Sequence, residues 1–144
     1  METHITDITR VIQLAVAPVF LLTAIGTLIT ALNNRLARAV DRRRVVRQQI
    51  DANAEHAAGL RAELAQLQRR ARLIYFAILA AVVAALLVCL VVASAFVGAL
   101  FSVEIAILVA VLFILSMVAL IASLSLFLRE IFLAVSFGKG LAEP

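Results

Sequence analysis

The stretch that decides the fold is Leu73–Val103, LIYFAILAAVVAALLVCLVVASAFVGALFSV, where 31 consecutive residues include no Asp, Glu, Lys or Arg. A helix rises about 1.5 Å per residue and must cross roughly 30 Å of hydrocarbon, so this stretch is long enough to span a membrane. Two further charge-free stretches of 24 residues each flank it, Val11–Asn34 and Ile105–Leu128. The whole chain of 144 residues is 65% hydrophobic and only 15% charged, with a mean hydropathy of +1.10. We therefore predict an all-α integral membrane protein with three transmembrane helices.

The distribution of charge predicts the orientation of these helices. Residues 33–72 hold ten arginines and four acidic residues, a net charge of +6, while the remainder of the chain sums to −2. Short segments rich in Lys and Arg stay in the cytoplasm. We therefore expect the N-terminus outside and the C-terminus in the cytoplasm. Glu2 and Asp7 argue against a secretory signal peptide, because its leading segment must be positively charged.

Helix signals divide the chain further. Thr6 resembles an N-cap, which predicts a helix start near Ile8. No Gly or Pro lies between Gly26 and Gly59, so the first helix is expected to continue past the membrane, turn within 51–59 and return as a helix into the second span. The predicted segments are an extracytoplasmic N-terminus (1–10), a first transmembrane helix (11–32), a basic cytoplasmic helical hairpin (33–72), a second transmembrane helix (73–98), an outer turn (99–103), a third transmembrane helix (104–128) and a cytoplasmic tail (129–144).

Small residues recur at helical spacing in the second and third spans, where they predict close packing of helices in lipid. These rows are Ala77, Ala81 and Ala85, then Ser94 and Gly98, then Ala106 and Ala110, and finally Ser116, Ala119 and Ser123. Cys89 lies in the middle of the second span and has no partner for a disulfide. We expect Cys89 to be a small buried apolar residue.

A polar stripe follows one face of the first helix. At about 100° per residue, its members fall within roughly 80° of one another, and two apolar residues extend the same face outward. The polar members are Thr23, Thr27, Thr30, Asn34, Arg38 and Asp41, and the apolar members are Val16 and Phe20. One interpretation is the wall of a pore in a homo-oligomer, with an apolar constriction and a charged inner vestibule. The other is a helix interface, in which threonine hydroxyls bond to the carbonyl four residues back.

The arginine block beyond this stripe has two interpretations as well. The simpler one is topology and solvation, and the sharper one is contact with anionic lipid headgroups or with a cytoplasmic protein partner. The residues proposed for that contact are Arg35, Arg42, Arg43, Arg44 and Arg47. Asp41 lies three residues from both Arg38 and Arg44, which predicts intrahelical ion pairs. No aromatic residue interleaves the block, so nucleic acid is not an expected partner.

Candidates for chemistry are few. Glu104 is a possible acid at the outer mouth of an oligomeric pore, although the helix dipole also explains an acid in a first helical turn. His56 with Glu55 and Asp51 lacks the Cys/His spacing of a zinc site, so no metal is expected. No phosphate-binding loop, nucleophile elbow or metalloprotease motif occurs. The sequence therefore predicts neither enzymatic activity nor a cofactor.

The first helix also carries a family resemblance. Ala17, Pro18, Leu21 and Leu22, followed by NRLARAVDRRR at Asn34–Arg44, resemble the opening of domain-of-unknown-function family 2721. The resemblance is close over the first third of the chain and otherwise rests on hydropathy. It implies a small bacterial inner-membrane protein, and it brings no substrate, cofactor or catalytic residue because the family is uncharacterised.

Two functions follow from these patterns. The first is a homo-oligomeric pore or ion channel lined by the polar face of the first helix. The alternative is a non-conducting membrane scaffold or accessory subunit whose arginine-rich cytoplasmic hairpin binds anionic lipid or a protein partner. Membrane lipids are expected partners in both cases.

Overall fold

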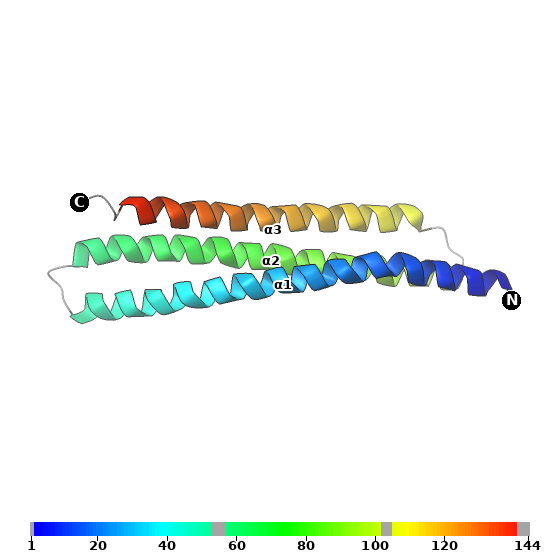
Figure 1. The fold of residues 1–144 in the computed structure, drawn as a ribbon, viewed down its shortest axis with the longest axis horizontal. Coiled ribbons are helices and arrows are strands. Elements are labelled where there is room, and N and C mark those ends of the chain that lie inside the picture. The colour runs from blue at the N-terminus through cyan, green and yellow to red at the C-terminus, as the bar shows by residue number, and fades with distance from the viewer. Residues whose placement is uncertain (1, 53–56, 102–104, 141–144) are drawn as a thin grey trace. The chain divides into compact units, whose positions relative to one another are not determined.

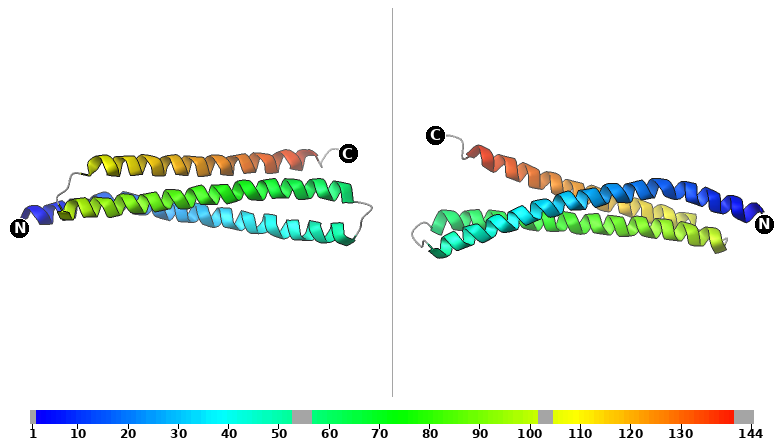
Figure 2. Two further views of the ribbon diagram at one scale, coloured as in Figure 1. Left: turned by 180° about the vertical axis from the view of Figure 1, so that it is seen from behind. Right: turned by 60° about the horizontal axis from the view of Figure 1, so that its bottom comes forward.

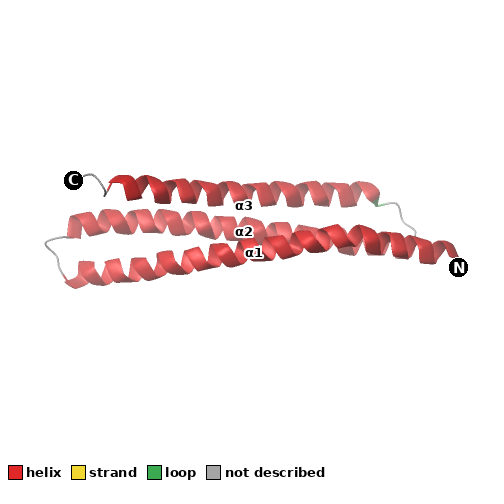
Figure 3. Cartoon of the chain, in the orientation of Figure 1, coloured by secondary structure: helices red, strands yellow, loops and turns green. Residues whose placement is uncertain are grey.

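The computed structural model describes residues 2–52, 57–101 and 105–140. Within these residues it contains three α-helices and no strand: α1 (Glu2–Ala52), α2 (Ala57–Phe101) and α3 (Ala106–Gly140) (Figures 1 and 3). Each helix is long and apolar enough to cross a membrane. The structure therefore confirms the all-α class with three helices of membrane-spanning length, as in a multi-pass membrane protein.

Several helix ends differ from the sequence predictions. α1 begins at Glu2, so the predicted start near Ile8 is wrong and Thr6 is inside the helix instead of capping it. The predicted turn over 51–59 is shorter, because α1 includes Ala52 and α2 begins at Ala57. The predicted outer turn over 99–103 is partly wrong, because α2 extends to Phe101. At the end of α2, Ala99, Leu100 and Phe101 are apolar residues that a helix accommodates, so nothing there ends α2 before Phe101. α3 continues through 129–140, the segment assigned above as a tail.

The chain divides into two compact units, each of which contains part of all three helices. Unit 1 consists of Met1–Ile29 with Ala80–Ile121, and unit 2 consists of Thr30–Leu79 with Ala122–Pro144. Within each unit the part from α2 runs antiparallel to the part from α1 (Figure 2).

Small side chains form the centre of unit 1. Ile25 of α1 is buried against Ala81, Ala84 and Val88 of α2. Partly buried residues from all three helices surround this cluster, namely Leu21, Leu22, Ile29, Ala85, Ala119 and Leu120. Alanine side chains allow two helix backbones to approach closely, which is how helices associate when lipid removes the hydrophobic drive between them. The predicted packing role of Ala81 and Ala85 is confirmed.

Unit 2 is held in part by a polar contact between helices. Ser123 of α3 donates its hydroxyl to the carbonyl oxygen of Ala77 in α2, at 2.7 Å. Both residues are fully buried. Because the side chain of Ala77 is only a methyl group, its backbone carbonyl is accessible to the neighbouring helix. The hydrogen bond to this carbonyl offsets the cost of burying the Ser123 hydroxyl. The remaining buried hydrophobic residues of unit 2 are Leu32, Val46, Leu67 and Ile74.

The inward-facing positions recur every seven residues, the repeat of helices that pack as left-handed coiled coils. In α1 this repeat contains Ile25, Leu32, Ala39 and Val46. α2 has two such rows, the first at Leu67, Ile74, Ala81 and Val88 and the second at Arg70, Ala77, Ala84 and Val91. In α3 the repeat contains Ser116, Ser123 and Glu130. Two charged residues, Arg70 and Glu130, thus occupy inward-facing rows. Their charges must be compensated inside unit 2.

The outward faces carry large apolar side chains. Phe20 is 71% exposed, and Leu79, Leu86 and Ile114 are exposed as well. In a membrane protein such faces contact the hydrocarbon of the lipid. Cys89 lies on such a face and is exposed, so the expectation of a buried thiol is wrong. Its neighbour Val88 occupies the inward-facing position instead.

Candidate anion-binding site

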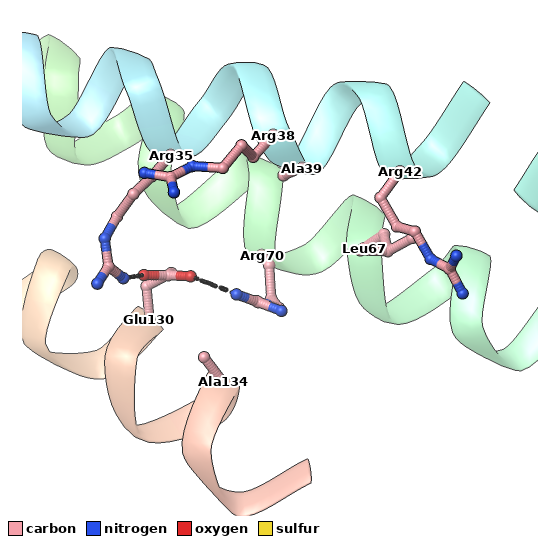
Figure 4. Close-up of a pocket in the computed structure, with 8 residues that line it drawn as sticks. All are labelled: Arg35, Arg38, Ala39, Arg42, Leu67, Arg70, Glu130 and Ala134. Carbon is pink, nitrogen blue, oxygen red and sulfur yellow. Dashed lines mark hydrogen bonds and ion pairs between the residues drawn. The ribbon is translucent and has the colours of Figure 1, made fainter. Parts of the chain in front are cut away.

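A buried carboxylate lies at the centre of the candidate site in unit 2. Only 1% of the Glu130 side chain is exposed. Its Oε2 accepts a hydrogen bond from Nη1 of Arg35 at 2.7 Å, and its Oε1 accepts bonds from Nη2 and Nε of Arg70 at 2.8 and 3.3 Å (Figure 4). Each of the three helices therefore supplies one member of the group. A buried carboxylate is stable only with such compensation, since its desolvation costs several kcal/mol.

An aromatic ring fixes Arg35 in this group. The Cζ atom of Arg35 lies 5.0 Å from the centroid of the Phe127 ring. Phe127 precedes Glu130 by three residues, so the two side chains lie on the same side of α3. The face of the Phe127 ring attracts the guanidinium of Arg35, and Glu130 binds the edge of the same guanidinium. Arg35 is thereby held between α1 and α3.

Two more arginines of α1 lie near this group without bonding to Glu130. Arg42 binds Glu63 of α2 through Nη2 and Nε, at 2.8 and 2.9 Å. Arg38 donates from Nε to the carbonyl oxygen of Asn34, at 3.3 Å. Figure 4 shows Arg38 folded back along α1 and Arg42 directed away from Glu130. The ion pairs predicted for Asp41 are wrong, because no ion pair of the described side chains includes it.

These side chains line a pocket of about 380 Å³, called the arginine pocket below. Its lining consists of Arg35, Arg38, Ala39, Arg42, Leu67, Arg70, Glu130 and Ala134 (Figure 4). Four guanidinium groups and one carboxylate give the wall an excess of positive charge. Guanidinium groups bind phosphate and carboxylate oxygens in pairs, so the chemistry of the wall suits an anion.

The arginine pocket lies where the charge-free stretches end. Arg35 is the first charged residue after Val11–Asn34, and Glu130 lies two residues beyond Ile105–Leu128. Arg70 lies three residues before Leu73–Val103 begins. Because these three residues are in contact, all three helices change from apolar to charged at one level of unit 2. In a membrane-spanning bundle that level is the boundary between hydrocarbon and headgroups.

The predicted polar stripe of α1 is on an exposed side of that helix. Its eight members are all exposed: Val16, Phe20, Thr23, Thr27, Thr30, Asn34, Arg38 and Asp41. Thr23 and Thr27 donate their hydroxyls to the carbonyl oxygens of Val19 and Thr23, at 3.2 and 3.1 Å, as the interface interpretation expects. The buried side of α1 consists instead of Ile25, Leu32 and Val46. Of the stripe, Arg38 alone lines the arginine pocket.

The arginine block separates into two groups. Arg35 and Arg42 line the arginine pocket, whereas Arg43, Arg44 and Arg47 do not. Arg44 and Arg47 are exposed and Arg43 is half-buried. Glu104, Glu55 and His56, which were considered for a pore mouth and a metal site, lie outside the described residues.

Arg70 and Glu130 were missed by the sequence analysis. The signal that identifies Glu130 is its spacing: it follows Ser116 and Ser123 at intervals of seven residues, on the face that already predicted helix packing. Arg70 likewise precedes Ala77 and Ala84 by seven and fourteen residues. When the two seven-residue rows are extended beyond the charge-free stretches, Arg70 falls on the inward face of α2 and Glu130 falls on the inward face of α3.

Comparison with known proteins gives a family and no relative of known activity. Residues 15–139 match the model of a family described as Protein of unknown function (DUF2721). This match covers most of the chain and extends well beyond the first third, where the residues quoted above resemble the family. No curated protein and no solved structure matches the chain.

Proposed function

Because the chain belongs to DUF2721, a family of unknown function, we propose a function from the site itself: the protein binds the headgroup of an anionic phospholipid in the arginine pocket. The observation that supports this most directly is the cluster of four arginines around one buried carboxylate. Basic pockets between membrane helices bind phosphorylated headgroups. The protein then acts as a non-conducting membrane scaffold or accessory subunit, the alternative left open by the sequence.

The placement of the pocket favours a lipid as the source of the anion. The pocket is at the level where the three charge-free stretches end, so its arginines are in reach of phosphates in the adjoining leaflet. Its apolar lining, Ala39, Leu67 and Ala134, suits the glycerol and ester groups next to a headgroup. We assign residues 33–72 to the cytoplasmic side of a bacterial inner membrane, because their charge of +6 favours retention there.

The test is lipid binding to delipidated protein in detergent, measured by native mass spectrometry. Phosphatidylglycerol should bind more tightly than the zwitterionic phosphatidylcholine. Arg35→Gln should weaken phosphatidylglycerol binding about fivefold, because each arginine near a headgroup contributes about 1 kcal/mol. Arg35 is the variant of choice since it lines the pocket and since Arg70 still compensates Glu130 when Arg35 is replaced.

The matched control is Arg72→Gln. Arg72 is exposed, borders the second charge-free stretch and is not part of the pocket lining. It should leave phosphatidylglycerol binding within twofold of the parent. Equal losses in the two variants, or equal binding of the two lipids by the parent, would show that the pocket is not the binding site.

A second candidate function, a homo-oligomeric pore, rests on a different observation. The polar stripe of α1 is exposed in a helix that otherwise presents apolar residues to lipid, so a second copy of the chain would shield it. Reconstituted protein should then pass ions through liposomes, and Thr27→Phe should suppress the flux while the oligomer keeps its mass. Val111→Phe, at an exposed apolar position of α3, is the control. Silent liposomes with the parent protein would exclude the pore.

A further inference from the structure

We infer that the headgroup held in the arginine pocket carries two phosphates, as in cardiolipin, and not one; this inference rests on the function proposed above. The argument starts from charge. Arg35 and Arg70 share Glu130, and Arg42 binds Glu63. Arg38 has no carboxylate partner among the described side chains. Four arginines and two glutamates leave a formal charge of +2.

That residual charge selects the ligand because the pocket borders hydrocarbon. Uncompensated charge is costly next to lipid, where little water is present to solvate it. A headgroup with one phosphodiester leaves the site at +1, while a headgroup with two phosphodiesters makes it neutral. The neutral complex is the more stable one at this boundary.

The unused donors of the arginines agree with two phosphates. Arg35 binds Glu130 through Nη1 alone, and Arg38 bonds to the Asn34 carbonyl through Nε alone. Each guanidinium has five N–H donors, so both keep an edge for an anion. One guanidinium binds one phosphate with a pair of hydrogen bonds, and two guanidinium groups on successive turns of α1 therefore suit two phosphates.

The size of the pocket also fits a headgroup. Its volume of about 380 Å³ is near the lower end of the range for small-molecule sites, roughly 300–1,000 Å³. A headgroup of two phosphates joined by glycerol falls within this scale, while the acyl chains remain in the bilayer. Arg38 is then the residue that determines specificity, since its charge is the one that the second phosphate neutralises.

The experiment compares cardiolipin with phosphatidylglycerol on delipidated full-length protein, at equal phosphate, by native mass spectrometry. The parent should prefer cardiolipin about fivefold, as expected for one more phosphate paired with an arginine. Arg38→Gln lowers the residual charge to +1 and should bring this preference close to one, whereas Arg72→Gln should keep the parent's value. Circular dichroism verifies that each variant is folded.

A second variant changes the residual charge of the pocket in the opposite direction. Glu63→Gln removes the partner of Arg42 at an exposed position and raises the residual charge to +3, so the preference for cardiolipin should persist or increase. A parent that binds phosphatidylglycerol as tightly as cardiolipin would overturn the inference and leave the proposed function standing. Binding of neither lipid above phosphatidylcholine would overturn both. Displacement of cardiolipin by an equal concentration of pyrophosphate would show that the anion is a soluble phosphate and not a lipid.

Discussion

Glu130 is a carboxylate that the fold buries among apolar helices and compensates with two guanidinium groups. Neither arginine is buried to the same degree: Arg35 is 36% exposed and Arg70 is 33% exposed. Removing the carboxylate would therefore leave two like charges facing each other at the edge of lipid. The pair of Arg42 and Glu63 provides a natural comparison, because its side chains are 53% and 36% exposed while that of Glu130 is buried.

We expect Glu130→Gln to destabilise the protein by about 3–5 kcal/mol, the usual cost of removing one partner from a buried ion pair. Glu63→Gln should cost at most about 1 kcal/mol, since exposed ion pairs contribute little. Unfolding by SDS in mixed micelles, followed by far-UV circular dichroism, measures both. Similar losses in the two variants would show that Glu130 is solvated and that the pair is not structural.

The residues of the site could be predicted only in part. Arg35, Arg38 and Arg42 stand out in the sequence because they are crowded on α1 just after a charge-free stretch. Glu130 follows Arg129 just after the third charge-free stretch, in the segment 129–144 that was predicted as a cytoplasmic tail. Its burial depends on which face of α3 meets the other helices, and that is a property of three helices together.

At the scale of the elements, α2 is the helix whose small residues decide the packing of unit 1. Ala81 and Ala84 are fully buried against Ile25, so a larger side chain there has no space. Ala93 is on the same helix but exposed. Ala84 and Ala93 therefore differ in burial but have the same helix propensity, so a comparison of substitutions at the two positions isolates the effect of packing.

Ala84→Leu should therefore destabilise the protein by about 1–3 kcal/mol, because added methylenes in a tight contact force neighbouring side chains and backbones apart. Ala93→Leu should change the stability by less than about 0.5 kcal/mol. Unfolding in mixed micelles again provides the measurement. A neutral Ala84→Leu variant would mean that α1 and α2 do not approach closely at this point.

The helices themselves are predictable, while their ends are not. Charge-free stretches of 24 or more residues leave no alternative to a membrane-spanning helix, so all three were found. Thr6 resembles a cap by residue type, yet α1 continues to Glu2 because the preceding residues permit a helix as well. A residue type preferred at the N-cap does not by itself fix where a helix begins.

At the scale of the whole molecule, we propose three membrane spans, which would place the two chain ends on opposite sides of the membrane. We expect single cysteines at Thr3→Cys and Glu143→Cys, each in a Cys89→Ser background, to react with a membrane-impermeant maleimide from opposite sides of spheroplasts. The background substitution is required because Cys89 is exposed and would itself react if solvent reached it. Thr3→Cys should label from outside, as the charge of +6 on residues 33–72 predicts. Labelling of both from one side would exclude an odd number of spans.

The Arg35–Glu130–Arg70 cluster also has a consequence for biosynthesis. The ribosome completes α1 and α2 before α3, so the two arginines enter the bilayer boundary ahead of the glutamate that neutralises them. Until α3 arrives, their compensation has to come from water or from lipid phosphates. A chain terminated before residue 130 never receives that carboxylate, and it presents a persistent pair of positive charges that distinguishes an unfinished molecule from a finished one.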